Sequence, residues 1–264
     1  MKNRGLFSVL SALAWLVGIA STSQGTQQPR AFQPLTVYYV RHAESGHNVV
    51  KNWKLVPTAL RPAYVGNEDA FSPAGEKQVA TLTCELRTMK FDFIAASPMW
   101  RARNTILPYL KACGQKAEIW PELTETPSVH TQWLRADVRL PPPSPKLFDG
   151  ETAIQLPEDE QPFFTFRKGG SRLLDLYNSD EAGRTANSLA LAQKTIALIR
   201  DRYSQSGKTI LLVGHGNSGS TLLRELIAIE LDKPHLDNIG MWMAEEQPNG
   251  SFQLKLLNNR PYVN

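Results

Sequence analysis

The chain has 264 residues, of which 42% are hydrophobic and 20% are charged, and its formal net charge is +4. These values are those of an ordinary globular protein, long enough for one large domain or one domain with a sizeable insertion. The charge is too small for a nucleic-acid-binding surface, and no stripe of Lys and Arg with interleaved aromatic residues is present. A mild positive balance suits an anionic substrate, so we expect a small-molecule partner and no nucleic acid.

Residues 1–25 have the pattern of a secretory signal peptide. Lys2 and Arg4 provide a basic start, and an apolar run over 6–20 is followed by small residues suited to cleavage. The run is shorter than the roughly twenty residues that span a bilayer, and no later stretch is long and apolar enough. We therefore expect export, periplasmic or secreted, and no membrane partner in the mature form. An uncleaved N-terminal anchor is the alternative.

A polar linker over 26–34 is expected to lead into a single domain over 35–264. Continuous apolar runs predict buried strands, and helical periodicity with capping residues predicts helices. In chain order we expect a strand over 35–40, a helix over 72–89, a strand over 91–96, a helix over 101–112, a strand over 117–120, a helix over 187–203, a strand over 209–213, a helix over 220–231, and an antiparallel pair over 241–243 and 252–256.

The alternation of strands and helices predicts an α/β fold, a three-layer sandwich with a mostly parallel central sheet and helices on both faces. The alternation breaks over about 126–185, where prolines, an acidic patch and clustered phenylalanines show no clear period. A stretch of that length is more often functional than a plain connection, so we expect an inserted lid there.

Polar side chains stand at or just beyond the ends of the predicted inner strands. They are Arg41, His42, Ser97, Arg101, Glu122, Glu125 and His215. Because the carboxyl ends of parallel strands face one crevice, these groups can converge. Guanidinium groups can hold phosphoryl oxygens, an imidazole can attack phosphorus, and a carboxylic acid can protonate the leaving oxygen. The set therefore indicates phosphoryl-transfer chemistry.

Five short motifs in this order resemble those of the histidine phosphatase superfamily, in its phosphoglycerate-mutase-like branch (branch 1). The segments 41–48, 71–78, 97–105, 123–125 and 213–216 resemble R-H-G-E-x-x-x-N, L-[ST]-x-x-G-x-x-Q, S-x-L-x-R-A-x-x-T, L-x-E and V-x-H-G. Ala43 stands for the usual Gly, and Phe71 stands for the usual Leu.

The resemblance implies that His42 is the nucleophile and is transiently phosphorylated, and that Glu125 protonates the leaving alcohol. The phosphate pocket would consist of Arg41, Asn48, Arg101 and His215. Attack by His42 requires a neutral ring, so its other nitrogen should donate to a backbone carbonyl or a carboxylate. Glu122 is the alternative acid, three residues before Glu125.

The mutases of the family continue L-x-E with R-H-Y-G, which grips the carboxylate of phosphoglycerate, whereas this chain continues with Thr126-Pro127-Ser128-Val129. The expected function is therefore an exported, metal-independent phosphatase that hydrolyses phosphomonoesters through a phosphohistidine. A mutase-type phosphotransferase and a non-enzymatic phospholigand-binding protein are the alternatives.

The sequence predicts no cofactor and no metal site. His47 and His130 could join His42 around a metal, but their spacing fits no familiar motif. In an oxidising compartment Cys84 and Cys113 could pair, which the sequence leaves open, together with the oligomeric state and the identity of the substrate.

Overall fold

The structure is a computed structural model that describes residues 31–126, 147–176, 181–229, 231 and 235–263, with the side chains of 181–185 excepted. The expected signal peptide, most of the expected linker and part of the expected lid lie outside the described residues. Phe32–Asn264 form one unit. Among the described helices, none has both the length and the apolar character needed to cross a bilayer.

Eight strands form one mixed sheet in the order β10-β9-β8-β1-β7-β2-β3-β5. Strands β1, β7, β2, β3 and β5 run parallel, and β8, β9 and β10 extend the sheet as antiparallel strands. Strands β4 and β6 form a separate antiparallel pair. The bounds are β1 Thr36–Arg41, β2 Phe93–Ala96, β3 Ala117–Ile119, β4 Asp149–Ala153, β5 Phe164–Phe166, β6 Arg172–Leu174, β7 Thr209–Gly214, β8 Met241–Glu246, β9 Phe252–Leu257 and β10 Arg260–Pro261. The predicted mostly parallel sheet is confirmed.

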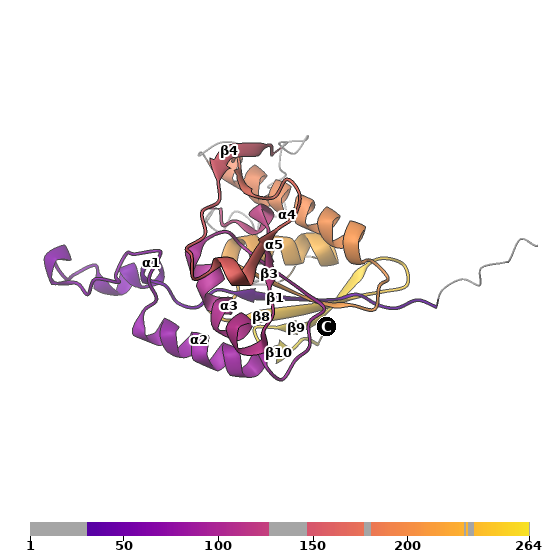
Figure 1. The fold of residues 1–264 in the computed structure, drawn as a ribbon, viewed down its shortest axis with the longest axis horizontal. Helices are drawn as coiled ribbons and strands as arrows, with labels where there is room; N and C mark the ends of the chain where they lie inside the picture. The colour runs from indigo at the N-terminus through magenta and orange to yellow at the C-terminus, as the bar shows by residue number, and fades with distance from the viewer. Residues whose placement is uncertain (1–30, 127–146, 177–180, 230, 232–234, 264) are drawn as a thin grey trace, which may run out of the picture. The chain divides into compact units, whose positions relative to one another are not determined.

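Helices cover both faces of this sheet (Figure 1). Val37 of β1 belongs to a buried cluster with α4 and α5, whereas Val40 belongs to a second cluster with α2 and α3. In β7, Ile210 belongs to the first cluster and Leu211 to the second, because successive side chains of a strand point to opposite faces of the sheet. The helix bounds are α1 Gly46–Val49, α2 Pro73–Leu86, α3 Trp100–Cys113, α4 Glu181–Tyr203 and α5 Gly216–Ile227. The predicted three-layer α/β sandwich is confirmed.

The structure confirms two helix ends that capping residues in the sequence predict. Ser72 caps α2, since its Oγ accepts the N–H of Gly75 at 3.0 Å. Helix α3 ends at Gly114, which has a φ of 63°, a conformation that favours glycine. The exposed thiols of Cys84 and Cys113, on α2 and α3, are both free.

Two elements differ from the sequence-based expectation. Helix α5 begins at Gly216, one turn before the predicted start at residue 220, so the backbone N–H groups of its first turn lie directly beyond His215. Within the expected lid over 126–185, β5 pairs in parallel with β3 as the edge strand of the main sheet. The described part of the expected lid therefore contributes a strand to the main sheet.

Candidate active site

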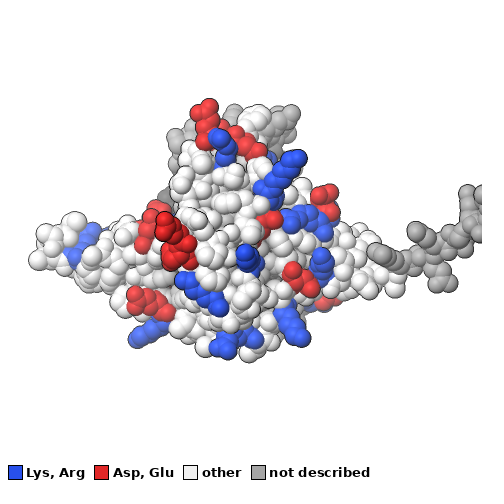
Figure 2. Space-filling model, viewed as in Figure 1, with Lys and Arg blue, Asp and Glu red and all other residues white. Residues whose placement is uncertain are grey.

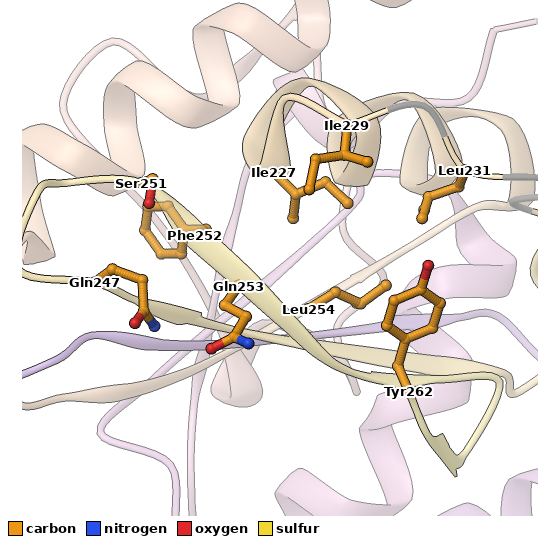
Figure 3. Close-up of a pocket in the computed structure, with 9 residues that line it drawn as sticks. All are labelled: Ile227, Ile229, Leu231, Gln247, Ser251, Phe252, Gln253, Leu254 and Tyr262. Carbon is orange, nitrogen blue, oxygen red and sulfur yellow. The ribbon is translucent and has the colours of Figure 1, made fainter. Parts of the chain in front are cut away.

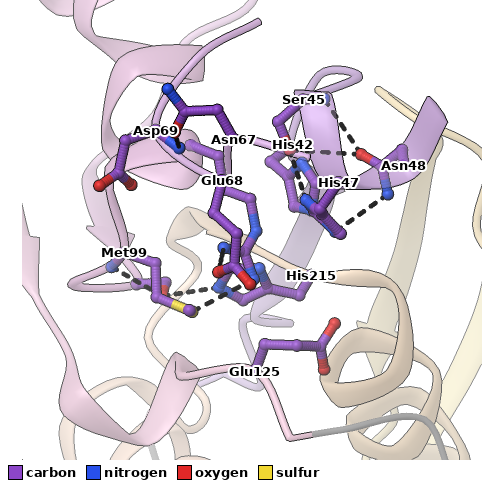
Figure 4. Close-up of polar contacts among 12 residues, drawn as sticks. His42, Ser45, His47, Asn48, Asn67, Glu68, Asp69, Met99, Glu125 and His215 are labelled. Atoms are coloured by element: carbon purple, nitrogen blue, oxygen red, sulfur yellow. Dashed lines mark hydrogen bonds and ion pairs between the residues drawn. The ribbon is translucent and has the colours of Figure 1, made fainter. Parts of the chain in front are cut away.

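The predicted site residues converge at the carboxyl ends of the parallel strands. Arg41 ends β1, His42 follows it, and His215 follows β7, its neighbour in the sheet. A pocket of about 480 Å³ lies there, part of which is drawn in Figure 4. Its lining comprises Arg41, His42, His47, Asn48, Glu68, Met99, Arg101, Glu125, Thr126, Gly216, Asn217 and His235. His215 contacts this pocket through His42, at a ring-centroid distance of 5.2 Å.

His42 is held with one ring nitrogen engaged and the other available. Its Nδ1 lies 2.7 Å from the carbonyl oxygen of Ala43, so Nδ1 carries the proton and Nε2 carries the lone pair. Burial lowers the pKa of His42 well below 6.5, although the bond to Ala43 opposes this, and the charges of Arg101 and Arg41 lower it further. The ring is therefore neutral at physiological pH, as a nucleophile must be.

Ala43, which replaces the usual glycine, fits this turn without strain. Its backbone N–H donates to Thr105 Oγ1 at 2.9 Å, and Thr105 Oγ1 donates to the carbonyl of Arg101 at 2.7 Å. Ala43 is not among the residues with positive φ in the described chain. The loop after β1 is thus tied to the first turns of α3, the helix that carries Arg101.

Both arginines keep a buried donor without a partner among the described residues. Arg41 Nη1 donates to the carbonyl of Leu236 at 2.6 Å, and Arg101 Nη1 pairs with Glu68 Oε2 at 2.9 Å. In each side chain Nε is buried and has no hydrogen bond within the described structure. Buried donors normally have partners, so two unmet guanidinium donors in one pocket indicate an anion-binding site.

Glu125 lies at the amino end of α5. Its carboxylate accepts backbone N–H groups of Thr126 at 3.0 Å, Ser218 at 3.2 Å and Asn217 at 3.4 Å. Burial nevertheless raises the pKa of Glu125 to about 7, because it outweighs these bonds and the charge of Arg101. A carboxyl group that titrates near neutrality can both donate and accept a proton.

Glu122, the alternative acid, is placed elsewhere. Its carboxylate forms an ion pair with Arg167, from the segment after β5, and Glu122 is not among the residues that line the pocket. Asn48 does line the pocket, but its Oδ1 accepts the N–H of Ser45 at 3.0 Å and its Nδ2 donates to His47 Nε2 at 3.1 Å. Asn48 therefore orders the loop after β1 in addition to facing the pocket.

Several pocket residues were not predicted from the sequence. Glu68 and Met99 reach Arg101 from either side, and Asn217 presents its backbone to Glu125. His47 was weighed only as a metal ligand, and the described residues contain no group of three or more side chains that could hold a metal ion. Figure 4 instead has His47 beside Ser45 and Asn48. The one sequence signal for a role of His47 in the site was its position next to Asn48. No sequence signal pointed to Glu68.

A second hollow, of about 260 Å³, lies between the end of α5 and β9 (Figure 3). Its walls are mostly apolar, with Ile227, Phe252 and Leu254 at the surface of the α4–α5 core. No acidic or basic side chain and no histidine lines it. It lacks the groups that phosphoryl transfer needs, so the candidate active site is the pocket at the strand ends.

Comparisons with known proteins give one family match over part of the chain. The family model of the histidine phosphatase superfamily (branch 1) matches residues 37–132. No curated protein sequence matches the chain.

Solved structures with the same fold share little sequence with the chain. A mycobacterial hydrolase is 16% identical, with 87% of this chain and 100% of that chain covered and a TM-score of 0.51. A mycobacterial glucosyl-3-phosphoglycerate phosphatase in complex with VO3 is 16% identical, with 85% and 99% covered and a TM-score of 0.51. A candidate alpha-ribazole-5'-P phosphatase from Escherichia coli is 17% identical, with 87% and 99% covered and the same TM-score. At these identities the likeness establishes the fold alone.

The family model covers the loop after β1, helices α2 and α3 and the segment that carries Glu125. The described fold brings His215, which follows β7, against His42. Over residues 37–132 the chain is therefore similar to the histidine phosphatase superfamily, branch 1.

Proposed function

We propose that the protein is a phosphomonoesterase that works through a phosphohistidine at His42. The observation that carries this proposal is the state of the His42 ring. Its Nδ1 proton is engaged by the carbonyl of Ala43, which leaves the Nε2 lone pair free in a pocket that also holds two arginines. A binding protein has no need of a free, neutral imidazole beside unmet guanidinium donors.

The proposed reaction has two balanced steps. In the first, His42 Nε2 forms a bond to phosphorus, the bond from phosphorus to the ester oxygen breaks, and Glu125 gives its proton to the leaving oxygen. In the second, the Glu125 carboxylate takes a proton from water, the water oxygen bonds to phosphorus, and the phosphorus–nitrogen bond breaks. Arg41 and Arg101 balance the charge on the phosphoryl oxygens in both steps.

The proposal includes metal independence. The two guanidinium groups supply the positive charge that a divalent cation supplies in other phosphatases, and their free Nε donors are directional. A mutase-type phosphotransferase remains the second candidate, because it would use the same His42, Arg101 and Glu125. It differs in returning the phosphoryl group to an organic acceptor.

The proposed function is tested by phosphate release from a panel of phosphomonoesters in the presence of EDTA, with the full chain and with His42→Ala. We expect turnover by the wild type and none by the variant, with equal thermal unfolding midpoints. A labelled ester should also leave an acid-labile phosphoryl group on the wild type alone. Undiminished activity of His42→Ala would exclude this mechanism, whereas isomer interconversion without phosphate release would select the mutase.

Export is a separate part of the proposal, supported by the leader pattern of residues 1–25, which lie outside the described residues. The amino-terminal sequence of the protein recovered from its host is the test. A chain that begins shortly after residue 25 and is found outside the cytoplasm is expected. An intact Met1 on a cytoplasmic protein would contradict export.

A further inference from the structure

Residues 50–65 form a surface arm between two parts of the active-site loop. The arm contains two short 3-10 helices, Val50–Trp53 and Thr58–Leu60. Its base is closed by backbone hydrogen bonds of 2.9 Å, from Gly46 to the carbonyl of Ala70 and from Gly66 to the carbonyl of Gly46. A Cβ on Gly46 would lie 1.6 Å from the carbonyl oxygen of Tyr64, so this close approach requires glycine. The arm is thus an Ω-loop pinned at its base.

The arm has its own internal order. Arg61 Nε donates to the carbonyl of Val56 at 2.7 Å, and the N–H of Val56 donates to the carbonyl of Trp53 at 3.0 Å. The N–H of Leu60 donates to the carbonyl of Pro57 at 2.9 Å. These bonds hold the arm in one shape that projects from the sheet and its helices in Figure 1, at the indigo end of the described chain. Its surface is therefore presented as a fixed structure.

The surface of the arm combines exposed leucines with basic residues. Leu55 is 99% exposed and Leu60 is 73% exposed, the two highest values for a leucine among the exposed hydrophobic residues of the described chain. Lys51, Lys54 and Arg61 lie in the same sixteen-residue stretch, 50–65, which contains no Asp or Glu. In Figure 2 the end of the arm is blue and white without red. Exposed apolar side chains with positive charge around them mark an interaction surface.

We propose that the arm docks the protein on an anionic lipid surface, with Leu55 and Leu60 inserted among the headgroups and the basic residues beside the lipid phosphates. Basic residues with leucines and a tryptophan are the composition that lies in such interfaces. A second copy of the chain fits less well, because an arm without acidic residues would meet the same three positive charges on its partner.

This proposal differs from the sequence-based expectation that the mature chain has no membrane partner. That expectation concerned stretches able to span a bilayer, and a surface contact needs no such stretch. No sequence pattern singles out Leu55 and Leu60, whereas the structure exposes them on a pinned projection.

The test is co-sedimentation of the full chain with vesicles of phosphatidylcholine alone or mixed with phosphatidylglycerol. We expect binding to the anionic vesicles that weakens as salt is added. Lys51→Gln with Lys54→Gln should weaken binding about fivefold for each charge removed. Leu55→Ser with Leu60→Ser should weaken it by about tenfold or more. Every variant carries the same residues 1–30, so differences between variants report on the arm.

The matched control is Lys90→Gln with Lys116→Gln, two exposed lysines that precede β2 and β3. They lie at the amino ends of parallel strands, opposite the edge that carries the arm, and their removal should leave vesicle binding unchanged. Equal loss in the control, or equal binding to neutral vesicles, would overturn the proposal. So would an oligomer, seen by light scattering, that the leucine variants dissolve, because the arm would then be a self-association surface.

Discussion

Ser97 Oγ lies 2.8 Å from His215 Nε2, so the hydroxyl and the ring share a hydrogen bond. Ser97 Oγ also accepts the backbone N–H of Met99, at 3.3 Å. The hydroxyl keeps its own proton while it accepts from Met99, so it is able to donate that proton to His215 Nε2. When the hydroxyl donates, the ring proton of His215 is on Nδ1, which is buried and has no partner among the described residues. Burial, together with the neighbouring His42 and arginines, lowers the pKa of His215 well below 6.5. A neutral ring in this tautomer presents a donor for a phosphoryl oxygen.

The first prediction is that Ser97→Ala lowers kcat about tenfold, the usual effect of losing a hydrogen bond that positions a catalytic histidine. The reason is that Nε2 of His215 would lose its donor and the ring could adopt the other tautomer. Nitrogen chemical shifts of labelled His215 report the tautomer directly and should move toward protonated Nε2. A loss of packing alone would lower stability without this change in the ring.

Ser97→Thr is the matched control for that variant, because it keeps the hydroxyl at the same carbon. It should retain the wild-type tautomer and most of the activity. If Ser97→Ala leaves both the nitrogen shifts and kcat unchanged, Ser97 has no positioning role.

The second prediction concerns pH. Glu125 must be protonated to act as the acid, and its pKa of about 7 means that this form is depleted above neutrality. For alkyl phosphates we expect kcat to fall above pH 7, approaching about tenfold for each further pH unit. Glu125→Gln should abolish this dependence and slow alkyl phosphates far more than aryl phosphates, whose leaving groups hardly need an acid.

The comparison of the two ester classes decides between the candidate acids. Equal slowing of alkyl and aryl phosphates by Glu125→Gln would remove the acid role from Glu125. Glu122→Gln is the control, since Glu122 pairs with Arg167 away from the pocket lining. It should affect stability, because it breaks a buried ion pair, and should leave the ratio of alkyl to aryl rates unchanged.

The fold was largely predictable because its signals are local. The run that ends at Arg41 is apolar on both faces of the sheet, and Ser72 and Gly114 mark helix ends by their own chemistry. The start of α5 was predicted a turn late, because the Gly- and Ser-rich residues after His215 have low helix propensity. Strand β5 was missed because an edge strand of three residues has too few positions to display a period.

The site was predictable where motif residues follow strands, and not where contacts depend on loops. His42, Arg101 and His215 are placed by strand ends and the first turn of a helix, so their convergence follows from topology. Glu68 lies in a loop without periodicity, and nothing in the sequence relates it to Arg101. The hydrogen bond between Ser97 and His215 joins two different strand ends, and no local pattern encodes it.

The third prediction is that Glu68→Gln tightens inhibition by inorganic phosphate by about threefold to tenfold. The Glu68 side chain is 58% exposed, and its carboxylate pairs with Arg101 at 2.9 Å inside the pocket, so it opposes an incoming anion there. Exposure to solvent keeps the expected effect modest. Asp69→Asn is the control, because Asp69 is the neighbouring acid and does not line the pocket. Equal tightening by both variants would reflect net charge alone, and weaker inhibition in Glu68→Gln would mean that Glu68 serves mainly to orient Arg101.

The fourth prediction is that His47→Gln makes the protein less sensitive to acid. Burial, with the charge of Arg101, lowers the pKa of His47 from 6.5 to about 4. Between these values the unfolded chain takes up a proton that folded His47 refuses, so acidification through this range favours unfolding. Thermal unfolding midpoints at pH 6.5 and pH 4 should therefore differ less in His47→Gln than in the wild type, although His42 and His215 keep part of the dependence. Glutamine can still reach Ser45 and Asn48, so the loop is expected to persist. The control is His235→Gln, because His235 is exposed. If His235→Gln reduced the acid sensitivity as much as His47→Gln, the effect would not come from the burial of His47.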